Sequence, residues 1–553
     1  MTNPPYTIDS DARPAASLLL LRDGDVGLEV LMLRRAERDG DPRSGAAVFP
    51  GGVLDARDRA AHVHTTSPDD AAWSQALLLD AGGLDYAVAA LRETFEEVGL
   101  LLAEREVDLT ALDAWRNALQ TGRSGIAELC VAESLRLDTA ALAYHSHWLT
   151  PPGAPKRFDT RFFAAAAPAG QVAVADEGEA LELMWLTPVA ALEPAHGLKL
   201  LPVTRRTLMD LGRFANAADA LSEAWERKHP PRIMPRRAAS SRGGAGSRIV
   251  LPDELPYAEV ARLDPTGRGD VFAELAAGVP VRLSPRVVRV TAPNPGPMTG
   301  PGTNSYLVSG DGGANWTCID PGPESAEHTQ ALLAAAAPGR IQRILVTHTH
   351  RDHSPGAHAL AAESGAPTSG RVADFPQWQD PSFVPDLPLA GGERLVLGAD
   401  ATLRVIHTPG HASNHLCYLL EEEQLLFTGD HVMQGSTVVI NPPDGDMSAY
   451  LASLQGLLDE PLQWFAPGHG FLVAHPHALL RALIAHRLKR EAKVLAAVRS
   501  LGLADVPALL PQVYDDVPAA LHGVAQRSLL AHLLKLSADG MVAERDGARW
   551  AIP

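Results

Sequence analysis

A cluster of histidines and aspartates directly after a predicted buried strand constrains this chain more than any other feature of its sequence. The strand spans residues 343–347, and the cluster is His348-Thr-His350-Arg-Asp352-His353. Because successive side chains of a strand alternate between its two faces, His348 and His350 lie on the same side. Asp352 and His353 lie in the turn before the next helix. Two pairs of metal-binding side chains therefore face two neighbouring points.

Three further candidate ligands follow, each just after a predicted strand. They are His411 in Thr-Pro-Gly-His411, Asp430 in Thr-Gly-Asp430 and His469 in Pro-Gly-His469. The glycine before each ligand allows a sharp turn. A lone histidine is more often a core or surface residue than a ligand, but these elements together predict a metal site. The chain's 3 cysteines are widely spaced, so imidazole and carboxylate groups hold the metal.

This ligand series resembles that of the metallo-beta-lactamase fold superfamily. The resemblance implies an αββα sandwich with two Zn²⁺ ions at its strand ends. One ion would be bound by His348, His350 and His411, and the second by Asp352, His353 and His469, with Asp430 bridging them. Two such ions activate a water for hydrolysis of an ester, thioester or phosphodiester. Asp352 is then a candidate catalytic residue as well as a ligand.

Within that superfamily, residues 300–308, 408–415 and 425–430 and the helix around 486–491 resemble the beta-lactamase-like protein 2 group. That group adds a C-terminal winged helix and includes single-strand endoribonucleases. The resemblance makes His415 a candidate catalytic residue that protonates a leaving oxygen. A purely structural hydrogen bond is the alternative for this histidine.

A second candidate site lies in the N-terminal half. Residues 85–99 have the apolar spacing of an amphipathic helix, with Asp85 as the expected N-cap and Gly99 as the stop. Glu93, Glu96 and Glu97 are spaced so that their carboxylates converge on the opposite face, where Arg92 can orient them. A solvated acidic helix face is the alternative reading.

Residues 92–99, with Phe49-Pro-Gly-Gly52, resemble the Nudix box, and the resemblance implies an α/β/α sandwich. Mg²⁺ or Mn²⁺ would be held by Glu93, Glu96 and Glu97, with Glu97 catalytic in cleaving a diphosphate. The box is split, because 40 positions separate Gly52 from Arg92, 26 more than the family motif has. This insertion resembles the peroxisomal coenzyme A diphosphatase branch. The upstream glutamate of the box is replaced by Leu84.

We expect a multidomain α/β and α+β protein. Residues 227–248 hold seven basic and no acidic residues among Pro, Ser and Gly, which is typical of an exposed linker. We expect five parts. They are a flexible N-terminus at residues 1–13, a Nudix-like domain at 14–226, a basic linker and connector at 227–279, a metallo-beta-lactamase fold domain at 280–480 and a winged-helix-like domain at 481–553.

The composition limits the kinds of partner that the protein can bind. No apolar stretch reaches the length of a membrane span, and the N-terminus lacks a secretory pattern, so we expect a cytoplasmic protein that binds no membrane. Residues 281–470 contain 9 Arg, no Lys and 19 acidic residues, which argues against a long RNA substrate. Arg487, Lys489, Arg490 and Lys493 could supply basic charge instead.

Three functional hypotheses remain open at this stage. In the first, both halves are enzymes acting on related small molecules, such as a CoA thioester and its diphosphate. In the second, the zinc domain is an endoribonuclease, and its winged helix and the basic linker grip single-stranded RNA. In the third, the Nudix domain is a non-catalytic nucleotide sensor. An iron-bearing oxidative site is a minor alternative, and the oligomeric state is left open.

Overall fold

The computed structural model describes residues 11–37, 44–175, 180–240, 246–376 and 379–553, and these fold as two compact units. The first unit contains residues up to 238 with 247–252 and 266–269, and the second contains the rest. Among the described residues, no helix combines the length and the apolar character that crossing a membrane requires.

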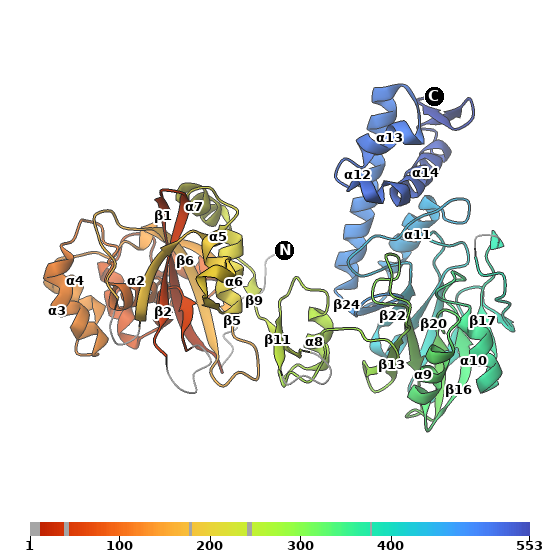
Figure 1. Cartoon of the computed structure of the whole chain (residues 1–553), viewed down its shortest axis with the longest axis horizontal. Coiled ribbons are helices and arrows are strands. Elements are labelled where there is room, and N and C mark those ends of the chain that lie inside the picture. The colour runs from red at the N-terminus through yellow and green to blue at the C-terminus, as the bar shows by residue number, and fades with distance from the viewer. Residues whose placement is uncertain (1–10, 38–43, 176–179, 241–245, 377–378) are drawn as a thin grey trace. The chain divides into compact units, whose positions relative to one another are not determined.

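The first unit is built on a mixed sheet of nine strands (Figure 1). Its central strands run β2-β1-β6-β5, and β1 pairs with β6 in parallel and with β2 antiparallel. The strands are β1 (Arg13–Gly24), β2 (Gly27–Arg35), β3 (Ala46–Val48), β4 (Gly51–Val53), β5 (Ala143–Leu149), β6 (Phe158–Ala166), β7 (Ala180–Leu186), β8 (Lys199–Leu200) and β9 (Arg232–Ile233).

Both faces of this sheet are covered by helices. Because side chains alternate along β1, Leu18 and Leu20 pack with α2, whereas Leu19 and Leu21 pack with α6 and α7. The α/β/α sandwich expected of the N-terminal half is therefore confirmed. The helices are η1 (Ala56–His64), α1 (Asp70–Leu77), α2 (Gly83–Val98), α3 (Leu109–Gln120), α4 (Ile126–Ala132), α5 (Pro188–Leu192), α6 (Pro202–Leu211) and α7 (Ala217–Glu226).

Helix α2 differs from its prediction at one end. It ends before Gly99 as expected, but it begins at Gly83 rather than after Asp85. The Asp85 carboxylate accepts hydrogen bonds from Arg59 and His62, each at 2.8 Å, instead of capping the helix. The predicted cap was wrong because these partners, on η1, compete for the same carboxylate.

The predicted linker carries more secondary structure than a plain tether would. Strand β9 pairs with β5, and β10 (Arg236–Ala239) pairs with β11 (Ser247–Val250). Residues 241–245 of this segment, and residues 1–10 of the expected flexible N-terminus, lie outside the described residues. The bounds of the linker and connector, residues 227–279, stay a prediction.

The second unit contains two packed sheets (Figure 1). The strands of the first sheet are β12 (Pro280–Arg282), β13 (Val287–Thr291), β14 (Asn304–Val308), β15 (Asn315–Ile319), β16 (Arg340–Leu345), β17 (Thr368–Gly370) and β18 (Leu387–Pro388). Those of the second are β19 (Arg394–Val396), β20 (Thr402–His407), β21 (Leu416–Leu420), β22 (Leu425–Gly429), β23 (Trp464–Pro467) and β24 (Val473–Ala474). Tyr306 and Leu345 of the first sheet share one core with Leu403 and Phe427 of the second.

Helices cover the outer faces of both sheets. The first sheet packs against α9 (Ala326–Ala336) and α10 (Gly356–Ser364), and the second against α11 (Met447–Leu457) and α12 (Pro476–Leu501). A short helix, α8 (Tyr257–Leu263), precedes the sandwich. The αββα arrangement implied by the resemblance is confirmed.

The chain ends in a small helical region with its own core. Helices α13 (Val506–Val513) and α14 (His522–Ala538) pack on the second half of α12. The region also contains a three-stranded sheet, made of β25 (Leu503–Asp505) before α13, and β26 (Ala543–Arg545) and β27 (Arg549–Ala551) after α14. The predicted hairpin is present, since β26 pairs antiparallel with β27. Asp546 and Gly547 at its turn both have the positive φ that tight hairpin turns require. This is the expected winged helix.

Candidate metal and catalytic sites

All seven predicted metal ligands lie at one end of the αββα sandwich, beyond the carboxyl ends of the strands. His348 and His350 follow β16, and Asp352 and His353 lie in the turn before α10. His411, Asp430 and His469 follow β20, β22 and β23. A Cβ on Gly410 would lie 2.3 Å from the backbone of Tyr450, so only glycine fits before His411.

Three imidazole nitrogens converge at the first point. His350 Nδ1 lies 2.8 Å from His348 Nε2 and 3.1 Å from His411 Nε2. Asp430 Oδ2 lies 3.8 Å from His411 Nε2. Burial lowers the pKa of His350 to about 3 and that of His348 well below its usual value. Both imidazoles are therefore neutral at neutral pH, as metal binding requires.

The remaining ligands converge at a second point. Asp352 Oδ2 lies 3.3 Å from His353 Nε2 and 3.2 Å from His469 Nε2. Asp430 Oδ1 lies 3.4 Å and 3.3 Å from the same two nitrogens. The two oxygens of Asp430 thus face one group each, Oδ2 the first and Oδ1 the second. The prediction that Asp430 bridges two ions requires this arrangement.

The residues of both groups fit divalent cations. His353 Nε2, His469 Nε2 and Asp430 Oδ1 are buried and have no hydrogen-bond partner among the described residues. Buried polar atoms are normally satisfied, so these atoms need a ligand. The ligand atoms of each group lie within 4.8 Å of one another, and imidazole with carboxylate is a donor set suited to Zn²⁺.

An outer ring of hydrogen bonds fixes the second nitrogen of four imidazoles. Such contacts orient a ligand and select the tautomer that leaves the other nitrogen for the metal. The partners are Thr347 Oγ1 for His348 (3.0 Å), Asp320 Oδ2 for His353 (2.9 Å), the Val439 carbonyl for His411 (2.8 Å) and the Gly302 carbonyl for His469 (3.2 Å).

Asp320 is a functional residue that the sequence analysis missed. Its carboxylate is 2% exposed and also accepts from the backbone N–H and the hydroxyl of Thr347, at 2.7 and 2.8 Å. It therefore holds the first ligand strand and His353 together. The sequence contained a signal for this residue. Asp320 directly follows a strand and precedes Pro-Gly. Three predicted ligands likewise follow a strand and lie beside a glycine, namely His411, Asp430 and His469.

His415 lies beneath the ligands and does not line the pocket beside them. It is fully buried, its Nδ1 pairs with Thr408 Oγ1 at 3.0 Å, and its ring stacks on His348 with centroids 5.0 Å apart. Burial lowers its pKa well below the usual value, which disfavours the imidazolium form that a proton donor needs. This position favours the structural alternative over the predicted role as a proton donor.

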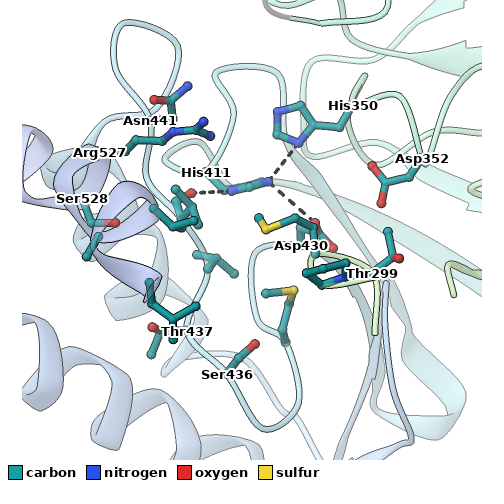
Figure 2. Close-up of a pocket in the computed structure, with 18 of the residues that line it drawn as sticks. Thr299, His350, Asp352, His411, Asp430, Ser436, Thr437, Asn441, Arg527 and Ser528 are labelled. Carbon is teal, nitrogen blue, oxygen red and sulfur yellow. Dashed lines mark hydrogen bonds and ion pairs between the residues drawn. The ribbon is translucent and has the colours of Figure 1, made fainter. Parts of the chain in front are cut away.

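A cavity of about 1200 Å³ opens beside the metal-binding groups (Figure 2). His350, Asp352, His411 and Asp430 line one side of it. The opposite side is formed by the loop 433–442 and by side chains of the terminal helices. The metal-binding groups and the terminal helices therefore line the same cavity.

Three hydrogen bonds anchor the loop 433–442 through its backbone. The carbonyl of Val439 accepts from His411, and the carbonyl of Val438 accepts from Arg487 on α12. The backbone N–H of Ile440 donates to Ser528 Oγ on α14 at 3.4 Å. The loop thereby connects the metal ligand His411 to the helices α12 and α14.

The predicted carboxylates of the first unit lie on one face of α2. Arg92 Nη1 donates to Glu93 at 2.8 Å and to Glu96 at 3.2 Å, and the N–H of Gly51 donates to Glu97 at 2.9 Å. A Cβ on Gly52 would lie 2.4 Å from the Glu93 carboxylate, so this glycine allows the loop to approach the helix. Burial raises the pKa of Glu93 to about 7.

The carboxylate that pairs with Arg92 comes from the inserted segment. Asp58, on η1, is fully buried and accepts from Arg92 Nε at 2.7 Å and from Nη2 at 3.2 Å. Leu84 is 2% exposed in the apolar core. The insertion thus supplies a carboxylate to a box whose own upstream position carries leucine.

This acidic cluster has the donor chemistry for Mg²⁺ or Mn²⁺. Three carboxylates, those of Asp58, Glu93 and Glu96, accept from the Arg92 guanidinium, and that of Glu97 accepts from the N–H of Gly51. Oxygen atoms are the ligands that these hard cations prefer. Within the described residues, however, only the two histidine–aspartate groups have ligand atoms mutually within 4.8 Å. Arg92 holds Glu93 and Glu96 in the present arrangement.

Comparison with known proteins gives three family matches. They are the metallo-beta-lactamase superfamily at residues 298–469, the NUDT19 Nudix domain at 67–200 and the beta-lactamase associated winged helix domain at 506–550. These matches confirm the family resemblances seen in the sequence.

Individual relatives resemble the C-terminal half. An atrochrysone carboxyl ACP thioesterase of Aspergillus chevalieri is 34% identical over 49% of this chain and 88% of its own length. A beta-lactamase-like protein 2 homolog of Drosophila melanogaster is 31% identical over 47% of this chain and 90% of its own. A solved beta-lactamase domain protein from Burkholderia ambifaria aligns at 21% identity with a TM-score of 0.45, covering 51% of this chain and 95% of that one.

Replacing ligands should remove metal. We expect protein purified without added metal to carry about two transition-metal ions per chain. His350→Ala should lose about one ion and Asp430→Asn more, because Asp430 faces both groups. Elemental analysis measures the content and also separates zinc from iron. His358→Ala, exposed on α10, is the matched control, and unchanged metal in both ligand variants would refute the site.

Removing the outer carboxylate should weaken metal binding without removing a ligand. An amide at position 320 keeps one acceptor oxygen, so Asp320→Asn cannot serve both Thr347 and His353. We expect metal affinity to fall by about 10–100-fold. Competition with a chromogenic chelator measures this. The exposed Asp311→Asn should match the unaltered protein, and equal affinities for both variants would exclude an orienting role for Asp320.

Proposed function

Because this chain belongs to the metallo-beta-lactamase superfamily and also carries a Nudix domain, we propose that its C-terminal half hydrolyses acyl thioesters at a two-zinc centre. The observation that carries the proposal is the cavity beside the ligands, whose far wall includes Met433, Val438 and Val524. An apolar wall of this kind suits an acyl chain. The thioesterase named among the relatives supports the same substrate class.

The residues of the site suit this reaction. The proposed ligands are His348, His350, His411, Asp352, His353, Asp430 and His469. Bound there, two zinc ions supply a water ionised near neutral pH and polarise the substrate carbonyl. Asp352 lines the cavity and keeps 26% of its side chain exposed, so it is placed to accept a proton from the attacking water. The new C–O bond replaces the C–S bond, and the products are a carboxylic acid and a thiol.

The ribonuclease alternative loses most of the basic charge that it invoked on α12. Arg487 is 3% exposed and donates to the carbonyl of Val438, and Arg490 is 6% exposed and pairs with Asp516 at 2.7 Å. Lys493 pairs with Asp515 at 2.5 Å. Phosphate contacts require accessible cations. Of the four basic side chains, Lys489 alone is exposed and unpaired among the described residues.

We further propose that the Nudix half cleaves a diphosphate-linked compound such as CoA with Mg²⁺ or Mn²⁺. The supporting observation is the acidic cluster on α2, in which Glu97 lies against the glycine loop and Asp58 pairs with Arg92. Asp58 also weakens the sensor hypothesis, since that hypothesis rested only on Leu84. The two activities would then act on one substrate family.

The thioesterase proposal predicts a specific pattern of hydrolysis. The intact protein should release thiol from hexanoyl-CoA, and His350→Ala should lower kcat/KM by about 10²-fold or more, because removing a ligand removes charge stabilisation. A thiol-reactive dye measures the release. His358→Ala should be unaffected. Cleavage of single-stranded RNA that depends on His350, with no thioester turnover, would establish the ribonuclease instead.

The Nudix proposal predicts a separable activity. With Mg²⁺, the intact protein should convert CoA into 4′-phosphopantetheine and adenosine 3′,5′-bisphosphate, which chromatography resolves. Glu97→Gln should abolish this cleavage, because it removes a candidate metal-binding charge, while His350→Ala should leave it intact. Glu106→Gln, an exposed glutamate of the same unit, is the control. If Glu97→Gln cleaves CoA as fast as the unaltered protein, or if neither the unaltered protein nor any variant cleaves CoA, this half has another role.

A further inference from the structure

The first two turns of α14 present one face to the cavity beside the metal ligands. Leu521, just before the helix, and Val524, Ala525 and Ser528 within it all line that cavity. Positions separated by three, four and seven residues share one side of a helix. Leu521 is 54% exposed although it is a large apolar residue. Leu521, Val524 and Ala525 therefore give this face an apolar side that borders the cavity, while Ser528 is bonded to the loop 433–442.

One cation stands on the same face. Arg527 lines the cavity, and in Figure 2 its side chain extends from α14 into the pocket. It is exposed and makes no hydrogen bond or ion pair with any described residue. Arg487 and Arg490 also line the cavity, but both are buried and already bonded. Arg527 is thus a free guanidinium beside an apolar wall.

A second cavity-lining cation, Arg351, also has no hydrogen bond or ion pair with any residue that the structure describes, and it lies between the ligands His350 and Asp352. Its replacement would disturb the metal site itself. Arg527 belongs to a different element, so its contribution can be measured with the ligands intact.

We propose that Arg527 binds an anionic group of the thioester substrate, so that the winged helix supplies part of the specificity of the metal site. A guanidinium pairs with carboxylate and phosphate through two parallel N–H donors. The apolar part of the substrate lies against Leu521, Val524 and Ala525, and its anion pairs with Arg527. The inference rests on the proposed thioesterase function.

Three thioesters separate the sources of the anion. Hexanoyl-N-acetylcysteamine has no anionic group, the adipoyl monothioester of N-acetylcysteamine adds a terminal carboxylate, and hexanoyl-CoA adds phosphates. Arg527→Gln should lower kcat/KM by about 10-fold or more on whichever anionic substrate uses the contact. The loss should lie in KM, since a binding contact acts on ground state and transition state alike.

Two further variants make the test specific. Arg527→Lys should recover part of the affinity, because it restores the charge without the planar fork. Arg481→Gln, an exposed arginine on α12 that does not line the cavity, should behave as the unaltered protein on all three substrates. Added salt should weaken binding of the anionic substrate in the unaltered protein and less so in Arg527→Gln.

The outcomes are distinguishable. A selective loss on the adipoyl substrate assigns the contact to a carboxylate, and a selective loss on the CoA thioester assigns it to a phosphate. Equal losses on all three substrates, or none, would overturn the role of Arg527 while leaving the thioesterase intact. If the metal-loaded protein cleaves none of the three, the proposed function fails and this inference fails with it.

Discussion

The C-terminal half depends on holding imidazoles and carboxylates together where water is largely excluded. Asp430 is 8% exposed, His353 is fully buried, and each has an atom with no hydrogen-bond partner among the described residues. Unsatisfied buried polar atoms cost free energy, and buried charges cost more. The fold tolerates this because strand ends from both sheets meet at one edge, where divalent cations would offset the charge. The outer hydrogen bonds keep the ligands from rearranging.

The sequence predicts the parts of this site that depend on local pattern. The strand–turn–ligand segments of His348, His411 and His469 lie where periodicity and glycine placed them, as does the acidic face of α2. Partners that meet across long stretches of chain were missed. Asp320 contacts His353 from 33 positions away, and Asp58 contacts Arg92 from 34. No short-range pattern encodes such distances, although a carboxylate after a strand was a usable signal.

Charge counts were the least informative part of the sequence. The basic residues of α12 read as an accessible strip, yet Arg487 and Arg490 are buried and bond to backbone carbonyls. A guanidinium can join helices to a loop as readily as it can bind a phosphate, and composition does not separate the two uses. Only the contacts show that Arg487 holds α12 against the loop 433–442, whereas Arg490 joins α12 to the end of α13.

The way that loop is anchored bears on how such a protein can evolve. Its three hydrogen bonds use the main-chain atoms of Val438, Val439 and Ile440, so they do not depend on which side chains those positions carry. Mutation at 436–439 can therefore reshape the cavity while His411 keeps its orientation. Substrate preference can drift in this lineage without passing through forms that have lost the metal centre.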